Sequence, residues 1–160
     1  MSNSSARRRF KRLSPDDAGS VAELDRANPS PWNSRQVSCE LASPTSLGLA
    51  IWDEPGGLAA FIIIRRVLDE AEILKIAVAE RSRRQGVGCN LLARAIADLH
   101  RQGIKKIFLE VRASNQAAIS LYQKCKFSPI GRRYNYYNDP VEDAICMAAD
   151  LTNTQTTRPE

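Results

Sequence analysis

The sequence of 160 residues is poor in histidine, and His100 is its single example. One imidazole excludes any site that needs two histidines, and a Ser-His-Asp triad would have to be built on His100. The four cysteines form no C-x-x-C pair, so they indicate neither a zinc site nor a redox dithiol. The longest apolar run, residues 58–64, is far shorter than the roughly 20 residues that cross a bilayer. We therefore expect no metal, no membrane association and a reducing, cytoplasmic compartment.

The net charge of +5 is unevenly distributed along the chain. Residues 7–12 carry five positive charges, and residues 81–106 carry seven positive charges and one negative charge. The rest of the chain is acidic, unlike a nonspecific nucleic-acid binder, so we expect no direct nucleic-acid recognition. Residues 1–9 are predicted to be a disordered basic arm, with docking to an RNA-rich partner as the alternative. Residues 152–160 are predicted to be a disordered tail, and residues 10–151 the single domain.

Hydrophobic periodicity and turn residues predict the element order α-α-β-β-β-α-β-α-β-β. Helices are expected from Ser14 to about Ala27 and from Asn33, where Gln36 completes a capping box. Strands are expected over 47–52, 58–67 and 70–78, then a helix after the loop of residues 79–88, a strand over 104–111, a helix after Asn115, and strands over 127–133 and 143–151. The first strands are antiparallel, and residues 70–111 form a central βαβ unit. The sequence thus predicts a single-domain α/β fold with a mixed sheet and a site near Val78 and Val111.

A basic, glycine-containing loop joins the strand ending at Val78 to the next helix. Its glycines allow close approach of a ligand to the backbone, and the helix start offers free N–H groups and a positive dipole end. The loop is neither a Walker A sequence nor a dinucleotide fingerprint. It predicts a pyrophosphate site, and the alternative is an ordinary turn with solvated arginines. The loop residues are Arg83, Arg84, Gln85, Gly86, Val87 and Gly88.

The same loop resembles the acetyl-CoA loop of the GCN5-related N-acetyltransferase (GNAT) superfamily, whose pattern Q/R-x-x-G-x-G/A is matched by Arg83, Gly86 and Gly88. Segments 70–78, 109–115, 117–122, 132–137 and 142–144, together with Pro31-Trp32, are similar to the bacterial ribosomal-protein alanine N-acetyltransferases of that superfamily. The similarity covers about residues 14–150 and is dense only after Leu68. Lys126-Phe127 departs from the family's usual Gly-Phe, and Cys89-Asn90 from its usual basic or small residues.

The resemblance implies a GNAT-like fold, acetyl-CoA as acyl donor, no metal, Glu110 as general base and Tyr122 as the acid for the thiolate. The backbone of Ile76, Ala77 and Val78 would bind the pantetheine arm, with the Val78 N–H toward the thioester oxygen. Asn115 would also hold the cofactor, although a helix cap explains it equally well. The alternatives are a Glu110 side chain paired with Arg112 and a Tyr122 ring that is simply part of the core.

The acceptor implied by the resemblance is a protein N-terminus, with Trp32, Tyr134 and Tyr137 lining its groove. The alternatives are a self-packed aromatic hairpin and a Trp32 that staples the first two helices. An α-amine with pKa ~7.7–8.0 is roughly a tenth neutral at pH 7, whereas a lysine near ~10.4 is only about 0.04% neutral. We therefore expect transfer to the N-terminal alanine of a small-subunit ribosomal protein by a monomer or weak dimer. A small-amine or lysine acetyltransferase and a noncatalytic acyl-CoA-binding module are the alternatives.

Overall fold

The computed structural model describes residues 7–152, in which seven strands form one mixed sheet in the order β1-β2-β3-β4-β5-β7-β6. The helices are α1 (Ala18–Asp25), α2 (Ser34–Ala42), α3 (Val87–Arg101) and α4 (Gln116–Lys124), with 3-10 turns η1 (Pro15–Asp17) and η2 (Glu80–Ser82). The strands are β1 (Arg7–Arg12), β2 (Ser46–Glu54), β3 (Gly57–Val67), β4 (Glu70–Val78), β5 (Lys106–Arg112), β6 (Ser128–Tyr137) and β7 (Glu142–Asp150). The predicted α/β fold with a mixed sheet is confirmed.

Strand β1 is the element that the sequence did not predict. Its six residues pair antiparallel with β2, from Arg7 opposite Glu54 to Arg12 opposite Leu49. The expectation of a disordered arm over residues 1–9 is therefore wrong for residues 7–9, and residues 1–6 lie outside the described residues. All six side chains are exposed, so the strand has no buried face to give it an alternating pattern. Backbone pairing with β2 and the acidic end of that strand stabilise it instead.

The predicted helix starts are found at the expected residues. The Gln36 N–H donates to Asn33 Oδ1, and the Asn33 N–H donates to Gln36 Oε1, each at 2.9 Å, which confirms the capping box. The Ser14 N–H donates to the Asp17 carboxylate at 2.9 Å, so a helical segment begins where it was expected. That segment is a 3-10 turn followed by α1, and it ends at Asp25 rather than near Ala27.

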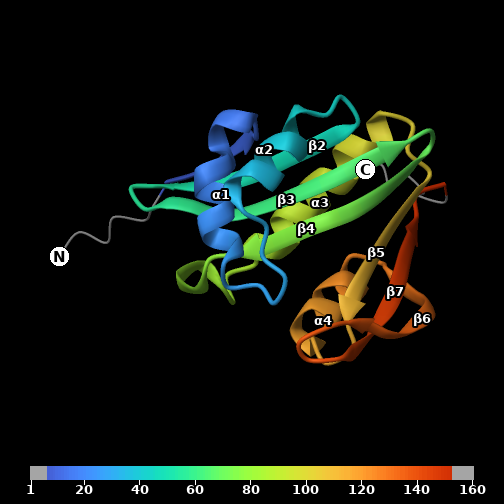
Figure 1. Cartoon of the computed structure of the whole chain (residues 1–160). Coiled ribbons are helices and arrows are strands. Elements are labelled where there is room, and N and C mark those ends of the chain that lie inside the picture. Colours follow the sequence, from blue (N-terminus) through green and yellow to red (C-terminus); the bar gives the residue numbers. More distant parts are fainter. Residues whose placement is uncertain (1–6, 153–160) are drawn as a thin grey trace.

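The helices cover the two faces of the sheet and divide the core in two (Figure 1). Helices α3 and α4 lie on one face, where Leu91, Leu92 and Leu99 of α3 pack with alternate residues of the strands. Helices α1 and α2 lie on the other face and bury Val21 and Val37 against β3. Within residues 7–152 no helix combines the length and apolar character needed to span a membrane.

Strands β4 and β5 pair in parallel for only three residues each and then diverge (Figure 1). Glu70 to Glu72 pair with Lys106 to Phe108, and no pairing of these two strands follows. On the other side of β4, Ile73 pairs with Ile64 and Lys75 with Ile63, so Leu74 is one extra residue. This bulge bends β4 and changes which residues face α3, because the alternation of side chains restarts after it. The sheet therefore opens at the carboxyl ends of β4 and β5.

Candidate active site

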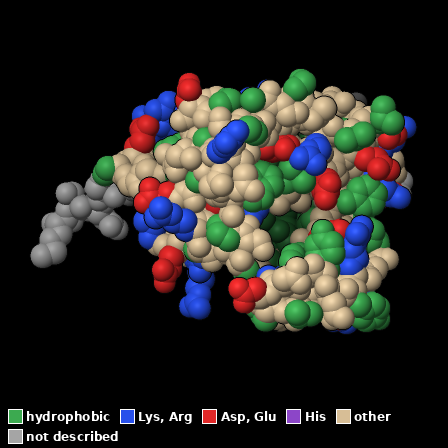
Figure 2. All heavy atoms as spheres, viewed as in Figure 1, with side chains coloured by type: hydrophobic (Ala, Val, Ile, Leu, Met, Phe, Trp, Pro, Cys, Tyr) green, Lys and Arg blue, Asp and Glu red, His purple; other side chains and the backbone are tan. Residues whose placement is uncertain are grey.

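A hollow of about 210 Å³ lies between the diverging strands. In the view of Figure 2 the surface is hollowed between the two halves of the sheet, with hydrophobic side chains in the opening. The structure brings several predicted site residues to it from β4, β5, α4 and β6, namely Ile76, Glu110, Asn115, Tyr122 and Tyr137. The loop between α1 and α2 contributes the rest of one wall through residues 28–30.

Tyr122 of α4 reaches this hollow from the core. Its side chain is buried, and its ring packs against Phe127 with a centroid distance of 5.8 Å. Burial, and to a lesser degree the nearby Tyr137, raises the pKa of the Tyr122 phenol well above its usual value. Within the described part of the chain its hydroxyl has no hydrogen-bond partner. Tyr122 is therefore both the predicted core residue and a neutral phenol that is available to a ligand.

Glu110 projects from β5 on the face away from α3. Its carboxylate pairs with the Arg133 guanidinium at 3.0 Å, and its side chain keeps 21% of its exposure. A hydrogen bond to this carboxylate, together with partial burial, raises the pKa of Tyr136. The alternative partner Arg112 is engaged elsewhere, with Glu142 at 3.8 Å. Glu110 is thus held by β6, an interaction that the sequence analysis missed.

Glu110 also borders a second, larger cavity of about 530 Å³ on the open face of the sheet. The residues that line this cavity all belong to strands, namely β3, β4, β5, β6 and β7. The lining residues are Arg65, Val67, Glu70, Ala71, Glu72, Phe108, Leu109, Glu110, Ile130, Gly131, Arg132, Arg133, Cys146 and Met147. Because Glu110 lines both cavities, its carboxylate stands where the two spaces meet.

The loop before α3 has the geometry of an anion site. Gly86 is left-handed, with φ of 73°, and is the N-cap of α3, so the first N–H groups of the helix have no partner within it. A Cβ at Gly88 would lie 3.3 Å from Val78 Cγ2 and 3.4 Å from Leu121 Cδ2. Glycine at this position lets α3 start close to the end of β4 and to α4. The helix dipole and the nearby arginines together favour a diphosphate here.

Some of the predicted loop residues can offer a ligand only their backbone, and others can also offer their side chains. Val87 is buried in the core and Gln85 is turned toward β1, so each can offer a ligand only its backbone. Arg83 donates from Nε to the Val78 carbonyl at 3.3 Å, and Arg84 is a left-handed residue with φ of 60°. Both arginines are exposed at the start of α3. Acetyl-CoA therefore fits the residues present: amides and arginines for its diphosphate, and the open edge of β4, including Ile76, Ala77 and Val78, for its arm.

The three aromatic residues predicted for the acceptor groove occupy different environments. Tyr137 lines the hollow, and burial and the charge of Glu110 raise its pKa to about 12. Trp32 is half-buried and packs against the core cluster on the α1–α2 face, with Lys75 Nζ 5.4 Å from its ring, and it lines neither cavity. Tyr134 is 77% exposed and also lines neither. The structure thus brings one of the three to the site.

Two features of the site were not found from the sequence. The first is the contact of Arg133 with Glu110, since the β6–β7 register shifts twice and cannot be read from local pattern. The second is the buried pair of Lys75 and Asp25 at 3.2 Å, which fixes the α1–α2 loop beside the hollow.

Asn115 caps α4 through a hydrogen bond from the Ala118 N–H at 3.1 Å and also lines the hollow. Among the described residues no cluster of His, Cys, Asp and Glu could hold a metal ion.

Comparison with known proteins agrees with this geometry. The Acetyltransferase (GNAT) family pattern matches residues 19–127. The ribosomal protein bS18-alanine N-acetyltransferase of Escherichia coli K12 is 46% identical over 99 residues, which are 61% of this chain and 67% of that protein. The protein of the same name from Haemophilus influenzae is 38% identical over 101 residues, 61% of this chain and 68% of that protein.

Solved structures give the same grouping. The crystal structure of the Escherichia coli ribosomal-protein-S18-alanine N-acetyltransferase superposes with a TM-score of 0.85 at 33% identity, covering 96% of this chain and all of that one. Arabidopsis thaliana NAA60 in complex with acetyl-CoA shares the fold, with a TM-score of 0.81 at 18% identity over 91% of this chain and 99% of that one. The chain therefore belongs to the GNAT acetyltransferase family, and it is an N-acetyltransferase that uses acetyl-CoA as acyl donor.

Proposed function

We propose that the protein transfers the acetyl group of acetyl-CoA to the α-amine of the N-terminal alanine of a small-subunit ribosomal protein. The observation that carries the proposal is the meeting of Glu110 and Tyr122 at one hollow between β4 and β5. The relatives named as bS18-alanine N-acetyltransferases support the choice of acceptor. Such an acceptor would be met in the cytoplasm.

In the proposed reaction the acceptor nitrogen attacks the thioester carbonyl carbon directly. Glu110 takes the proton of the amine, directly or through one water, while Arg133 holds the carboxylate in place. The new C–N bond forms and the C–S bond breaks. The leaving thiolate takes its proton from the Tyr122 hydroxyl, whose raised pKa keeps it protonated at neutral pH. Backbone N–H groups at the open edge of β4 would polarise the carbonyl.

The α-amine of a chain end suits this site better than a lysine. At pH 7 a far larger share of α-amines than of lysine side chains is already neutral, as their reference pKa values require. The loop of residues 28–30 and Tyr137 of β6 both line the hollow. Transfer to a lysine or to a small amine is the second candidate.

The test is release of coenzyme A with a panel of short peptides that begin with Ala, Ser or Met. Each peptide is supplied with a free and with a blocked N-terminus, and a blocked peptide with an internal lysine is added. We expect turnover with free N-termini, most with Ala, and none with the blocked peptides. Activity on the blocked lysine peptide without activity on free N-termini would contradict the acceptor assignment.

A further inference from the structure

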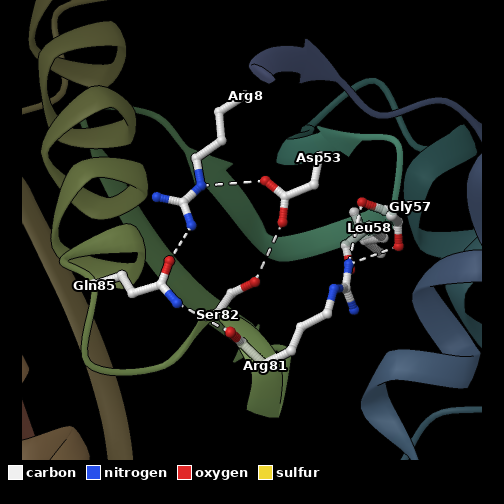
Figure 3. A network of polar contacts seen from close by, with 8 residues as sticks. Arg8, Asp53, Gly57, Leu58, Arg81, Ser82 and Gln85 are labelled. Atoms are coloured by element: carbon white, nitrogen blue, oxygen red, sulfur yellow. Dashed lines mark hydrogen bonds and ion pairs between the residues drawn. The ribbon is translucent and has the colours of Figure 1, made fainter. Parts of the chain in front are cut away.

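A polar network connects strand β1 to the loop that precedes α3 (Figure 3). Arg8 Nε pairs with Asp53 Oδ1 at 3.1 Å, and Nη2 of the same guanidinium donates to Gln85 Oε1. Asp53, at the end of β2, is 8% exposed, and its second oxygen accepts from Ser82 Oγ of η2 at 3.4 Å. One guanidinium thus joins β1, β2 and the loop.

Gln85 is the residue through which this network acts on the anion site. It lies between two left-handed residues, Arg84 with φ of 60° and Gly86 with φ of 73°. A left-handed conformation at a residue other than glycine is unfavourable and persists only where the surroundings hold it. Both polar atoms of the Gln85 side-chain amide are hydrogen-bonded. Its Nε2 donates to the Arg81 carbonyl at 3.0 Å, and its Oε1 accepts from Arg8. Gly86 and the free amides of α3 follow immediately.

The loop has a second attachment on the far side. Arg81 Nη2 donates to the Gly56 carbonyl at 2.8 Å and to the Leu58 carbonyl at 3.1 Å, which ties η2 to the turn between β2 and β3 (Figure 3). This attachment does not involve β1. The β1 network therefore sets the part of the loop next to the helix start, while Arg81 sets the part next to β4.

Strand β1 also braces α3 further along the helix. The guanidinium of Arg94 lies 4.9 Å from the centre of the Phe10 ring. Arg8 and Phe10 are two residues apart, so their side chains lie on the same face of β1. Arg8 contacts the loop before α3, and Phe10 contacts α3 itself. Arg9, between them, pairs instead with Glu54 at 2.6 Å on the surface.

We propose that β1 is a positioning element for the acyl donor: Arg8 fixes Gln85 and thereby holds the first amides of α3 in the arrangement that receives the diphosphate of acetyl-CoA. This rests on the diphosphate-binding role of the loop. Arg8 is a positioning residue and not a ligand, because Nε and Nη2 of its guanidinium already donate to Asp53 and Gln85.

The test compares Arg8→Ala with Arg9→Ala, using acetyl-CoA and acetyl-pantetheine as donors. Both variants lose one positive charge from β1, but only Arg8 reaches the loop. Acetyl-pantetheine carries the same thioester without the diphosphate. For Arg8→Ala we expect kcat/KM with acetyl-CoA to fall roughly tenfold, as loss of a charge-assisted hydrogen bond implies, with kcat unchanged within about twofold. Its kcat/KM with acetyl-pantetheine, and both values for Arg9→Ala, should stay within about twofold of wild type.

Gln85→Leu breaks the same link from the loop side and should reproduce the donor-dependent loss without touching the buried Asp53. If Arg8→Ala does not fold, the donor dependence of Gln85→Leu alone tests the proposal. Equal losses in Arg8→Ala and Arg9→Ala, equal losses with both donors, or no loss in Gln85→Leu would overturn the proposal. A wild-type protein that does not use acetyl-CoA at all would instead overturn the proposed function.

Discussion

Replacing Tyr122 by phenylalanine removes one hydroxyl from the hollow and leaves the buried ring in place. The ring keeps its packing against Phe127, and no hydrogen bond to another described residue is lost. The cost to the free energy of unfolding should therefore be below about 1 kcal/mol. The variant thus separates the chemical role of the hydroxyl from the structural role of the ring.

The effect of Tyr122→Phe on turnover should be large. A positioned general acid contributes about 10²- to 10⁴-fold, which corresponds to roughly 2.7–5.4 kcal/mol of barrier at about 1.36 kcal/mol per tenfold. We expect kcat to fall by at least about a hundredfold while the Kd of acetyl-CoA changes less than about twofold. Coenzyme A release gives kcat, calorimetry gives the Kd of acetyl-CoA, and thermal unfolding gives the stability, all on one preparation.

The pH dependence checks the same assignment. Because burial raises the pKa of Tyr122, the phenol keeps its proton throughout the range below its usual value of 10.0. Wild-type kcat should rise as the acceptor amine loses its proton and then stay level from about pH 8 to 10. A kcat in Tyr122→Phe equal to that of wild type would refute the acid role. A fall in wild-type kcat near pH 9 that disappears in the variant would instead contradict the raised pKa of Tyr122.

Three further predictions concern the base, the anion site and the first helical turn. Glu110→Gln keeps the shape of the side chain and should lower kcat at least about a hundredfold with the Kd of coenzyme A unchanged; unaltered kcat would exclude the base role. Gly88→Val pushes a branched side chain toward Val78 and should weaken acetyl-CoA binding and lower the stability by about 1–3 kcal/mol, and calorimetry showing wild-type affinity would contradict the close approach. Burial alone would raise the pKa of Asp17, but hydrogen bonds from the Ser14 N–H and Lys11 outweigh burial and lower the pKa below 3.8. The ionised carboxylate therefore stabilises the fold at neutral pH, and this stabilisation is lost as the pH falls through the lowered pKa. Asp17→Ala should cost about 1 kcal/mol in urea unfolding at pH 7 and progressively less as the pH is lowered below 3.8, and a cost that does not change with pH would refute the ionic origin.

The elements that local pattern predicted well have signals within a few residues of one another. The strand over 70–78 was predicted with its observed bounds, and the helix expected after the loop of residues 79–88 begins two residues earlier, at Val87. Asn33 and Asn115 cap the helices that their spacing indicated. In each case the turn residue and the hydrophobic period point to the same boundary.

The features that escaped prediction depend on contacts between distant segments. Strand β1 has no buried face, and its pairing depends on a partner about 45 residues away. The bulge at Leu74 restarts the side-chain alternation without any glycine or proline to mark it. The sequence suggested only Arg112 as a partner for Glu110, whereas the shifted register of β6 on β7 brings Arg133 to it. Trp32 likewise resembled a groove residue, whereas tertiary packing leaves it half-buried against the core cluster on the α1–α2 face.

The central claim is that a carboxylate and a phenol at the opened end of β4 and β5 carry out direct acetyl transfer. The single-turnover rate of the double variant Glu110→Gln/Tyr122→Phe, with saturating acetyl-CoA and an alanine-initiated peptide, tests it without interference from product release. The account predicts that this rate falls at least as far as that of either single variant while acetyl-CoA still binds with wild-type affinity. A double variant that transfers acetyl groups at the wild-type single-turnover rate would contradict it.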